Sequence, residues 1–324
     1  MHNETVKALY DYFSFDDKND FYPSYLYLKY IDYFLNKVVQ SLGMPTTELP
    51  YELDPGLENM MDMYIQHISD AASDHETSIY HAKVVRLQEA IRLIQQKEDV
   101  NIDIPERVVP FKQAKDIVLH NPQSIAIGRC ACRAADPNPQ IPPEEQEICM
   151  FVGEPVADFI AEQNHMFHKA TEEEALKVLD YSREKGLVQT VWFKKEIGKC
   201  YHMICNCDSF SCMGIKMWNL LEGTVPILAP SGYVAEVTDD CIGCQSCVDD
   251  HFCHFNALSM NEDGDRAVVN FDKCMGCGVC AERCPEGAIR LKREPSKGDP
   301  LDLDELLSQQ AEGKIGKSKS RPAG

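Results

Sequence analysis

Residues 241–253 read CIGCQSCVDDHFC, and residues 274–285 read CMGCGVCAERCP. Each run places three cysteines at C-x-x-C-x-x-C spacing and adds a fourth cysteine further along the chain. This spacing lets one loop occupy three corners of an iron-sulfur cube. The two runs therefore predict two 4Fe-4S clusters.

In sequences with two such runs, the fourth cysteine of each run binds the cluster of the other run. The predicted ligands are Cys241, Cys244, Cys247 and Cys284 for cluster 1, and Cys274, Cys277, Cys280 and Cys253 for cluster 2. The alternative is a pair of zinc knuckles, because paired C-x-x-C units also bind tetrahedral zinc. Zinc needs only two cysteines from each knuckle, whereas each run here offers three in register.

Residues 236–293 resemble the bacterial dicluster ferredoxin fold, and Pro285 follows Cys284 as it does in those proteins. The segment departs from that pattern in two ways: five residues instead of three separate Cys247 from Cys253, and His254 replaces a proline. Shielding and hydrogen bonding set a cluster's potential, so the longer loop is expected to alter cluster 2. His251 and His254 are candidates for coupling electron transfer to a proton. The alternative is that both are ordinary loop residues.

The composition narrows the possible partners and compartment. The chain has 324 residues, 15 cysteines and a net charge of −20, which predicts two or three domains. This acidity argues against nucleic acid or anionic membrane as a ligand and favours a protein partner with a basic face. Clustered cysteines indicate metal binding in a reducing compartment, so we expect a cytoplasmic protein. The N-terminus lacks a signal-peptide pattern, and no apolar run is long enough to span a membrane.

Six further cysteines form two tight groups outside the ferredoxin segment. They are Cys130, Cys132 and Cys149, followed by Cys205, Cys207 and Cys212. Both C-x-C pairs follow predicted strands, so we expect them to converge on a third metal centre if those strands are neighbours. The centre is an iron-sulfur cluster or, alternatively, a structural zinc site. Six cysteines exceed the four that a cubane needs, so either two are not ligands or the nuclearity is unusual.

The residues beside these cysteines suggest how the third centre is tuned. Arg129, Arg133 and Asn206 are predicted to donate hydrogen bonds to sulfur, and an arginine there can equally bind an anionic substrate. Cys200 is assigned to none of the three predicted metal centres.

A wider resemblance covers residues 105–293. The sequences Cys130-Ala-Cys-Arg133, Cys149-Met-Phe151 and Ile204-Cys-Asn-Cys207, ahead of the ferredoxin runs, resemble a family of anaerobic 4Fe-4S dicluster proteins with a cysteine-rich domain. The resemblance implies electron transfer beside a larger oxidoreductase and supplies no substrate. The chain departs from the family at residues 207–212, CDSFSC, where richer cysteine runs are usual.

The pattern of apolar residues predicts an α+β, multidomain protein. Residues 1–104 should be helical, with helices over 24–42, 57–68 and 79–94 and a winged-helix-like unit as one option. Residues 105–235 should form a small α/β cysteine-rich domain. It should contain a helix at 111–119, a strand at 124–127, a helix opening at Thr171, a hairpin of 187–193 with 201–204, and a helix at 213–221. The ferredoxin domain follows at 236–293, and residues 294–324 should be largely disordered.

Three functions remain open. The first is an electron-transfer subunit of an oxidoreductase, the second an enzyme whose third centre binds substrate, and the third a redox-sensing regulator. The chain has no G-x-G-x-x-G nucleotide-binding loop, so a flavin or NAD partner would be another chain. The acidic balance disfavours a DNA-binding regulator.

Overall fold

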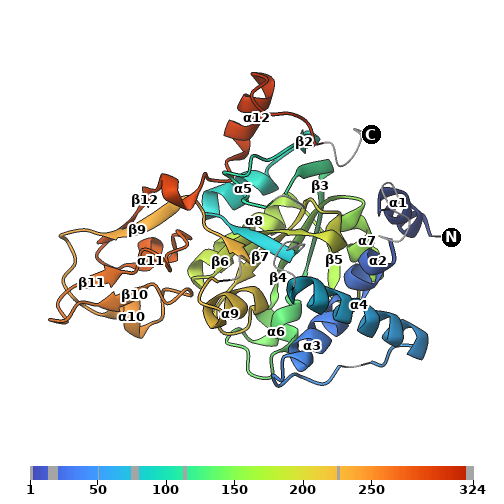
Figure 1. Cartoon of the computed structure of the whole chain (residues 1–324), viewed down its shortest axis with the longest axis horizontal. Helices are drawn as coiled ribbons and strands as arrows, with labels where there is room; N and C mark the ends of the chain where they lie inside the picture. The colour runs from blue at the N-terminus through green and yellow to red at the C-terminus, as the bar shows by residue number, and fades with distance from the viewer. Residues whose placement is uncertain are drawn as a thin grey trace.

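An α+β fold is built around one large sheet, as Figure 1 shows. The computed structural model describes residues 3–13, 21–49, 51–73, 80–111, 115–224 and 227–318. The eight-stranded sheet has the order β2-β3-β4-β7-β6-β1-β8, with β5 paired to β3. Its strands are β1 (Tyr80–Val84), β2 (Val100–Ile102), β3 (Ile117–Arg129), β4 (Glu147–Glu154), β5 (Phe167–Ala170), β6 (Val188–Lys194), β7 (Tyr201–Cys207) and β8 (Leu228–Ala229).

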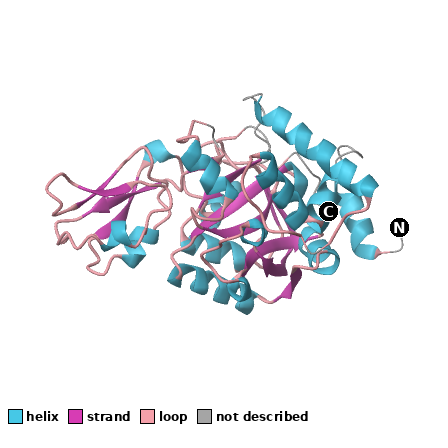
Figure 2. Cartoon of the chain, turned by 90° about the horizontal axis from the view of Figure 1, so that it is seen from below, coloured by secondary structure: helices cyan, strands magenta, loops and turns pink. Residues whose placement is uncertain are grey.

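Helices cover both faces of this sheet (Figure 2). One face, called here the N-terminal face, packs against α1 (Glu4–Phe13), α2 (Phe21–Lys29), α3 (Ile31–Ser41), α4 (Pro55–Ser73), α6 (Ala131–Ala135), α7 (Val156–Gln163) and α9 (Met213–Leu220). The opposite face packs against α5 (Leu87–Ile94), α8 (Glu172–Glu184) and α12 (Leu303–Ala311). Side chains alternate between these two cores along each strand: Phe151 of β4 lies in the first, and Met150 in the second.

The ferredoxin segment lies at one end of the molecule (Figure 1). It contains β9 (Tyr233–Val237) paired with β12 (Ile289–Arg293), β10 (Leu258–Met260) paired with β11 (Ala267–Val269), and the short helices α10 (Ser246–Asp249) and α11 (Val279–Arg283). Gly243 and Gly276 occupy equivalent places in the two cysteine runs, with φ of +68° and +65°. A Cβ atom on Gly276 would lie 2.2 Å from the Tyr233 carbonyl oxygen, so only glycine fits this turn.

Several sequence predictions for residues 105–235 are confirmed. Thr171 and Glu174 form a capping box at the start of α8. β6 and β7 form an antiparallel hairpin, the strand at 124–127 lies within β3, and α9 begins at Met213 as expected.

Other element predictions are wrong. The helix expected at 79–94 is confirmed only over α5 (Leu87–Ile94), whereas residues 80–84 form β1, because they pair with β6 on one side and residues 82–83 pair with β8 on the other. Sheet hydrogen bonds from distant strands outweigh the local helical pattern there. The helix expected at 24–42 is two helices that break at Tyr30. Residues 117–119, expected to be helical, belong to β3, whereas residues 112–114 lie outside the described part of the chain.

β1 and β2 precede residue 105 and belong to the same sheet as the later strands. The division of the chain at residues 104, 235 and 293 stays a prediction. Within the described segments, no helix is both long and apolar enough to cross a bilayer.

The expectation of a disordered tail is wrong for residues 294–318, and residues 319–324 lie outside the described part. Leu301, Leu303 and Leu306 are buried in the core on the face opposite the N-terminal helices. Asp302 caps α12 by accepting a hydrogen bond from the Glu305 backbone N–H at 3.1 Å. Burial of these three leucines orders this part of the tail despite its polar composition.

We expect Leu306→Ala to loosen α12, because removing a buried leucine side chain typically costs about 2–5 kcal/mol. Hydrogen-deuterium exchange should rise in residues 301–311. Ser308→Ala, on the exposed side of α12, is the matched control and should leave exchange unchanged. Equal exchange in both variants would contradict the docking of α12.

Candidate functional site

The cysteines predicted to bind cluster 1 lie together in the ferredoxin segment. Cys241, Cys244, Cys247 and Cys284 line one cavity, together with Pro285. Cys244 is exposed, whereas Cys247 is buried. This end of the segment therefore brings a cluster-sized set of thiols close to the protein surface.

The cysteines predicted to bind cluster 2 form a more buried group. Cys253, Cys274 and Cys280 lie close enough to Cys277 to interact with it electrostatically, and burial raises the pKa of the Cys277 and Cys280 thiols. The Cys253 sulfur accepts a hydrogen bond from the Ala257 backbone N–H at 3.2 Å, and the Cys274 sulfur accepts one from Ala235 at 3.4 Å. Backbone donors aimed at sulfur stabilise thiolates, so the residues present fit an iron-sulfur cluster.

The six remaining candidate cysteines also come together, in one cavity on the N-terminal face of the sheet. Cys130 and Cys132 lie at the start of α6, Cys149 lies on β4, Cys205 and Cys207 lie on β7, and Cys212 precedes α9. The two C-x-C pairs were expected to converge if the strands before them were neighbours. These strands, β3 and β7, are not neighbours, because β4 lies between them. β4 itself contributes Cys149, so the two C-x-C pairs still converge.

These six thiols form a closed ring, called here the thiol ring. Each thiol interacts with two others, in the order Cys130, Cys132, Cys212, Cys207, Cys205, Cys149 and back to Cys130. The Cys149 and Cys205 sulfur atoms are 3.8 Å apart. All six predicted residues are therefore brought together, and Cys200, which lies beside Asp116 in a β-bridge, is not among them.

Two opposed members of the thiol ring are the most acidic. Hydrogen bonds with Cys132 and Cys149 hold the pKa of Cys130 well below its usual value. Those with Cys205 and Cys212 lower the pKa of Cys207 to about 6. Interaction with Cys130 raises the pKa of Cys132, and interaction with Cys149 raises the pKa of Cys205. The lowered pKa values of Cys130 and Cys207 favour the thiolate, which is the form of cysteine that binds metal.

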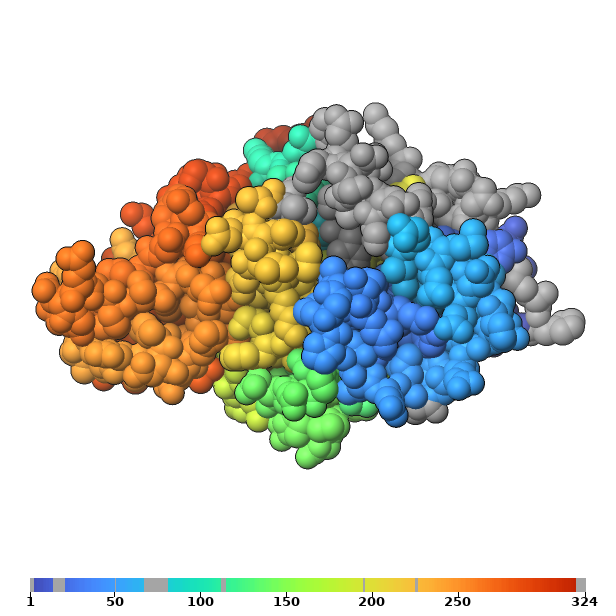
Figure 3. Space-filling model, turned by 60° about the horizontal axis from the view of Figure 1, so that its bottom comes forward, coloured from blue at the N-terminus to red at the C-terminus, as the bar shows by residue number. Residues whose placement is uncertain are grey.

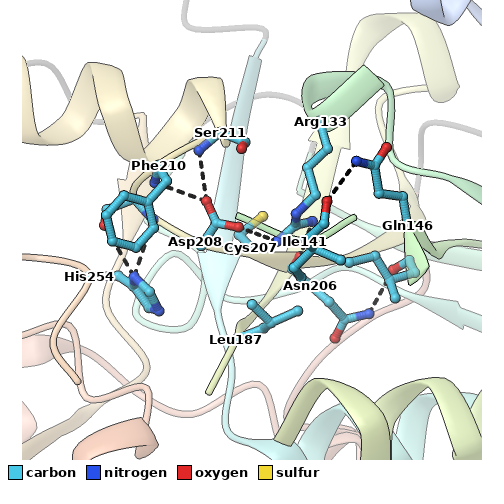
Figure 4. Close-up of polar contacts among 12 residues, drawn as sticks. Arg133, Ile141, Gln146, Leu187, Asn206, Cys207, Asp208, Phe210, Ser211 and His254 are labelled. Carbon is cyan, nitrogen blue, oxygen red and sulfur yellow. Dashed lines mark hydrogen bonds and ion pairs between the residues drawn. The ribbon is translucent and has the colours of Figure 1, made fainter. Parts of the chain in front are cut away.

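Arg133 is the buried cation beside these thiolates (Figure 4). Its guanidinium donates to the Asn206 carbonyl oxygen at 2.9 Å and to the Asp208 carboxylate at 2.5 Å. Its charge interacts with Cys130 and Cys207, and within the described residues its Nε has no hydrogen-bond partner. Arg133 thus lies beside the thiols, but its guanidinium donates to Asn206 and Asp208, and its role in tuning the third centre stays a prediction.

The predictions for Asn206 and Arg129 as sulfur donors are wrong. Asn206 alternates with Cys205 and Cys207 along β7, so its side chain leaves the sheet on the opposite face. Its amide nitrogen donates instead to the Ile148 carbonyl oxygen at 2.8 Å. Arg129 donates to the Gln146 side chain at 2.9 Å and lines a separate cavity with Asp32 and His165.

Sequence reasoning missed the residues of β6 that face the thiol ring. Thr190 pairs with Cys205 across the hairpin, and Trp192 pairs with Met203. The Thr190 hydroxyl lies 3.5 Å from the Cys207 sulfur. Lys194 lies two residues after Trp192 on β6 and is buried in the cavity that contains the thiol ring. Its amino group donates a hydrogen bond to the Tyr27 hydroxyl at 2.7 Å. The register of the predicted hairpin was the signal that could have identified every second residue of β6.

His254 connects the ferredoxin segment with the loop between β7 and α9 (Figure 4). Its Nδ1 accepts a hydrogen bond from the Ser209 backbone N–H at 3.1 Å, and its Nε2 lies 2.9 Å from the Gly186 carbonyl oxygen. Burial lowers its pKa, which favours the neutral ring. His251 lies near the Phe210 ring at 5.3 Å. A redox role for either histidine stays a prediction.

The comparisons with known proteins concern mainly the ferredoxin segment. A 4Fe-4S binding domain family matches residues 267–290. The chain is 38% identical over 56 residues to the pyruvate synthase subunit PorD of Methanothermobacter marburgensis, covering 17% of this chain and 60% of that protein. It is 31% identical over 134 residues to a tetrathionate reductase subunit of Archaeoglobus fulgidus, covering 38% of this chain and 62% of that protein.

A third relative is an NADH-quinone oxidoreductase subunit of Pelobacter propionicus, 31% identical over 70 residues, covering 22% of this chain and 35% of that protein. The chain thus spans less than two thirds of the length of these relatives. No solved structure matches the chain. Residues 267–290 thus match a 4Fe-4S binding domain, and parts of the chain are similar to subunits of pyruvate synthase, tetrathionate reductase and NADH-quinone oxidoreductase.

Arg133→Met should destabilise the site strongly, because it leaves the buried Asp208 carboxylate without its cation, which typically costs about 3–5 kcal/mol. The double variant Arg133→Met with Asp208→Asn should recover part of the loss. Arg129→Met removes a comparable side chain without a buried ion pair and serves as control. Chemical unfolding followed by circular dichroism measures these differences. Equal midpoints for the two single variants would show that the ion pair is dispensable.

Proposed function

We propose that the chain is an electron-transfer subunit in which two 4Fe-4S clusters link a larger oxidoreductase with a third metal centre at the thiol ring. One observation carries this proposal: Cys253 and Cys277, predicted ligands of cluster 2, pack against the same core as Cys149, Cys207 and Cys212 of the ring. Cys241 and Cys284 of cluster 1 pack only in the separate core of the ferredoxin segment. Electrons would therefore pass from cluster 1 through cluster 2 to the ring.

The packing between the ferredoxin segment and the ring supports this order. His254 follows Cys253 and accepts a hydrogen bond from Ser209, two residues after Cys207. Its carbonyl oxygen also accepts a hydrogen bond from Asn219 of α9 at 2.9 Å. In the space-filling view, the ferredoxin segment lies directly against the region around residues 200–235 (Figure 3). A short, packed route therefore runs from cluster 2 toward the ring.

The surroundings of the ring favour a relay over a substrate site. Tyr27, Ile31 and Leu35 of the N-terminal helices line the cavity, together with Trp192. These side chains exclude water from the thiols, and the polar groups of Arg133 and Lys194 in the same cavity already bond to Asp208 and Tyr27. We therefore favour the subunit of an oxidoreductase over a stand-alone enzyme.

The partner we propose is a cytoplasmic oxidoreductase chain with a basic docking face, and a flavin-containing chain is one candidate. Asp239, Asp240, Asp265 and Glu286 are exposed in the ferredoxin segment near the cavity of cluster 1. Acidic groups around an exposed redox centre steer a basic partner toward it.

The order of centres can be tested with one cysteine from each cluster. Cys277→Ser should remove or degrade cluster 2, so that a reductant delivered at cluster 1 no longer reduces the third centre. Cys244→Ser should degrade cluster 1 and leave cluster 2 intact. EPR after stepwise anaerobic reduction separates these outcomes, with Cys200→Ser as control. A third centre that is still reduced at the normal rate in Cys277→Ser would reject this route.

The rate of electron exchange with the partner should fall steeply with added salt. Between about 0.1 M and 1 M salt, the Debye length shrinks from about 10 Å to about 3 Å and screens the acidic surface. Stopped-flow measurement of cluster reduction by the purified partner checks this, and replacing Asp239 and Asp240 by asparagine should reduce the salt dependence. A flat rate with a partner that dissociates freely would contradict electrostatic docking.

A further inference from the structure

The spacing of one pair of thiols in the ring differs from that expected of cubane ligands. In a cubane each iron has three sulfide ligands and one thiolate, so the thiolates are on the order of 6 Å apart. Two thiolates on the same tetrahedral metal, at bond lengths of about 2.3 Å, lie about 3.8 Å apart. The Cys149 and Cys205 sulfur atoms are separated by 3.8 Å. This pair has the spacing of two ligands on one metal.

The other four ring cysteines line the same cavity as this pair. The cysteines predicted to bind cluster 1 line a different cavity, which contains four of them. One chain thus contains two kinds of cysteine arrangement, with four thiols around the cavity of cluster 1 and six around the ring cavity.

A mononuclear zinc site does not account for all six cysteines. Such a site needs four thiolates that converge on one point, so it would leave two of the six thiols in this cavity without a metal. Two thiolates on one iron, in turn, leave coordination positions that the pair does not fill. Inorganic sulfide is the ligand that completes iron in such sites.

The charges around the ring suit an anionic cluster with many thiolates. Arg133 and Lys194 line the same cavity as the six thiols. Both side chains are buried, with exposed fractions of 2% each. A cluster bound by several thiolates carries negative charge, which basic side chains in the cavity would compensate.

We infer that the thiol ring binds a non-cubane iron-sulfur cluster to which all six cysteines are ligands, with neighbouring thiolates sharing an iron. This inference rests on the proposed third centre and specifies its chemical class. It requires every cysteine of the ring, whereas a cubane would require only four of them.

The test is a scan of single Cys→Ala variants at the six ring positions in the full chain, prepared anaerobically with ⁵⁷Fe. Cys200→Ala, at a buried cysteine outside the ring, is the matched control. Iron, sulfide and zinc are measured per chain, and Mössbauer spectra resolve the iron sites. Each ring variant should lose most of the iron bound beyond the two ferredoxin cubanes, with the cubane signals retained, and the control should lose none.

The outcomes separate this inference from the proposed function. If two ring cysteines prove dispensable and the remaining iron gives a cubane spectrum, the inference is wrong and a third centre remains. If the wild-type protein has no iron beyond the two cubanes, or has zinc in the ring, the third iron-sulfur centre fails as well. The wild-type Mössbauer spectrum decides the matter without variants should any of them fail to fold, because a spectrum of cubane iron alone contradicts the inference.

Discussion

The alternation of side chains along β4, β6 and β7 is the constraint on which the third site depends. Because successive residues of a strand leave the sheet on opposite faces, Cys149, Cys205 and Cys207 all point toward the N-terminal face. The same rule places Thr190, Trp192 and Lys194 beside them. α6 and α9 then need to supply only three more thiols from their first residues. The sheet thereby brings together cysteines that are far apart in the sequence, from Cys130 to Cys212.

Burial of these cysteines determines how readily their thiols ionise. Six thiols in an apolar cavity would resist ionisation, because low polarity disfavours charge. The guanidinium of Arg133 opposes this effect from within the cavity. The ion pair of Arg133 with Asp208 also fixes the loop after β7, where Asp208 accepts hydrogen bonds from the Phe210 and Ser211 backbone N–H groups. The loop that contacts His254 is therefore held by the same residues that face the thiols.

Local spacing was sufficient to predict the ferredoxin segment, because its candidate ligands lie within two short runs and its turns require glycine at Gly243 and Gly276. It was also sufficient to identify the six cysteines of the second site, since a thiol that merely packs in a core has no reason to recur at C-x-C spacing. It failed for β1, whose place is set by distant pairing with β6, and it underestimated the order of the tail, where Leu301 lies before α12 and Leu303 and Leu306 lie within it. Lys194 was missed because its position depends on hairpin register and on Tyr27, which comes from a helix far away in the sequence.

The return of the chain after β12 restrains the ferredoxin segment at both of its ends. Asp299 forms ion pairs with Arg107 and Arg293, and its carbonyl oxygen accepts a hydrogen bond from the buried Lys83 of β1 at 2.8 Å. At the entry to the segment, the Arg86 guanidinium stacks on the Tyr233 ring at 3.9 Å. A redox module anchored in this way does not swing on a tether between donor and acceptor. Electron tunnelling within the chain would occur across a fixed gap, and exchange between molecules would then be governed by collision at the exposed end.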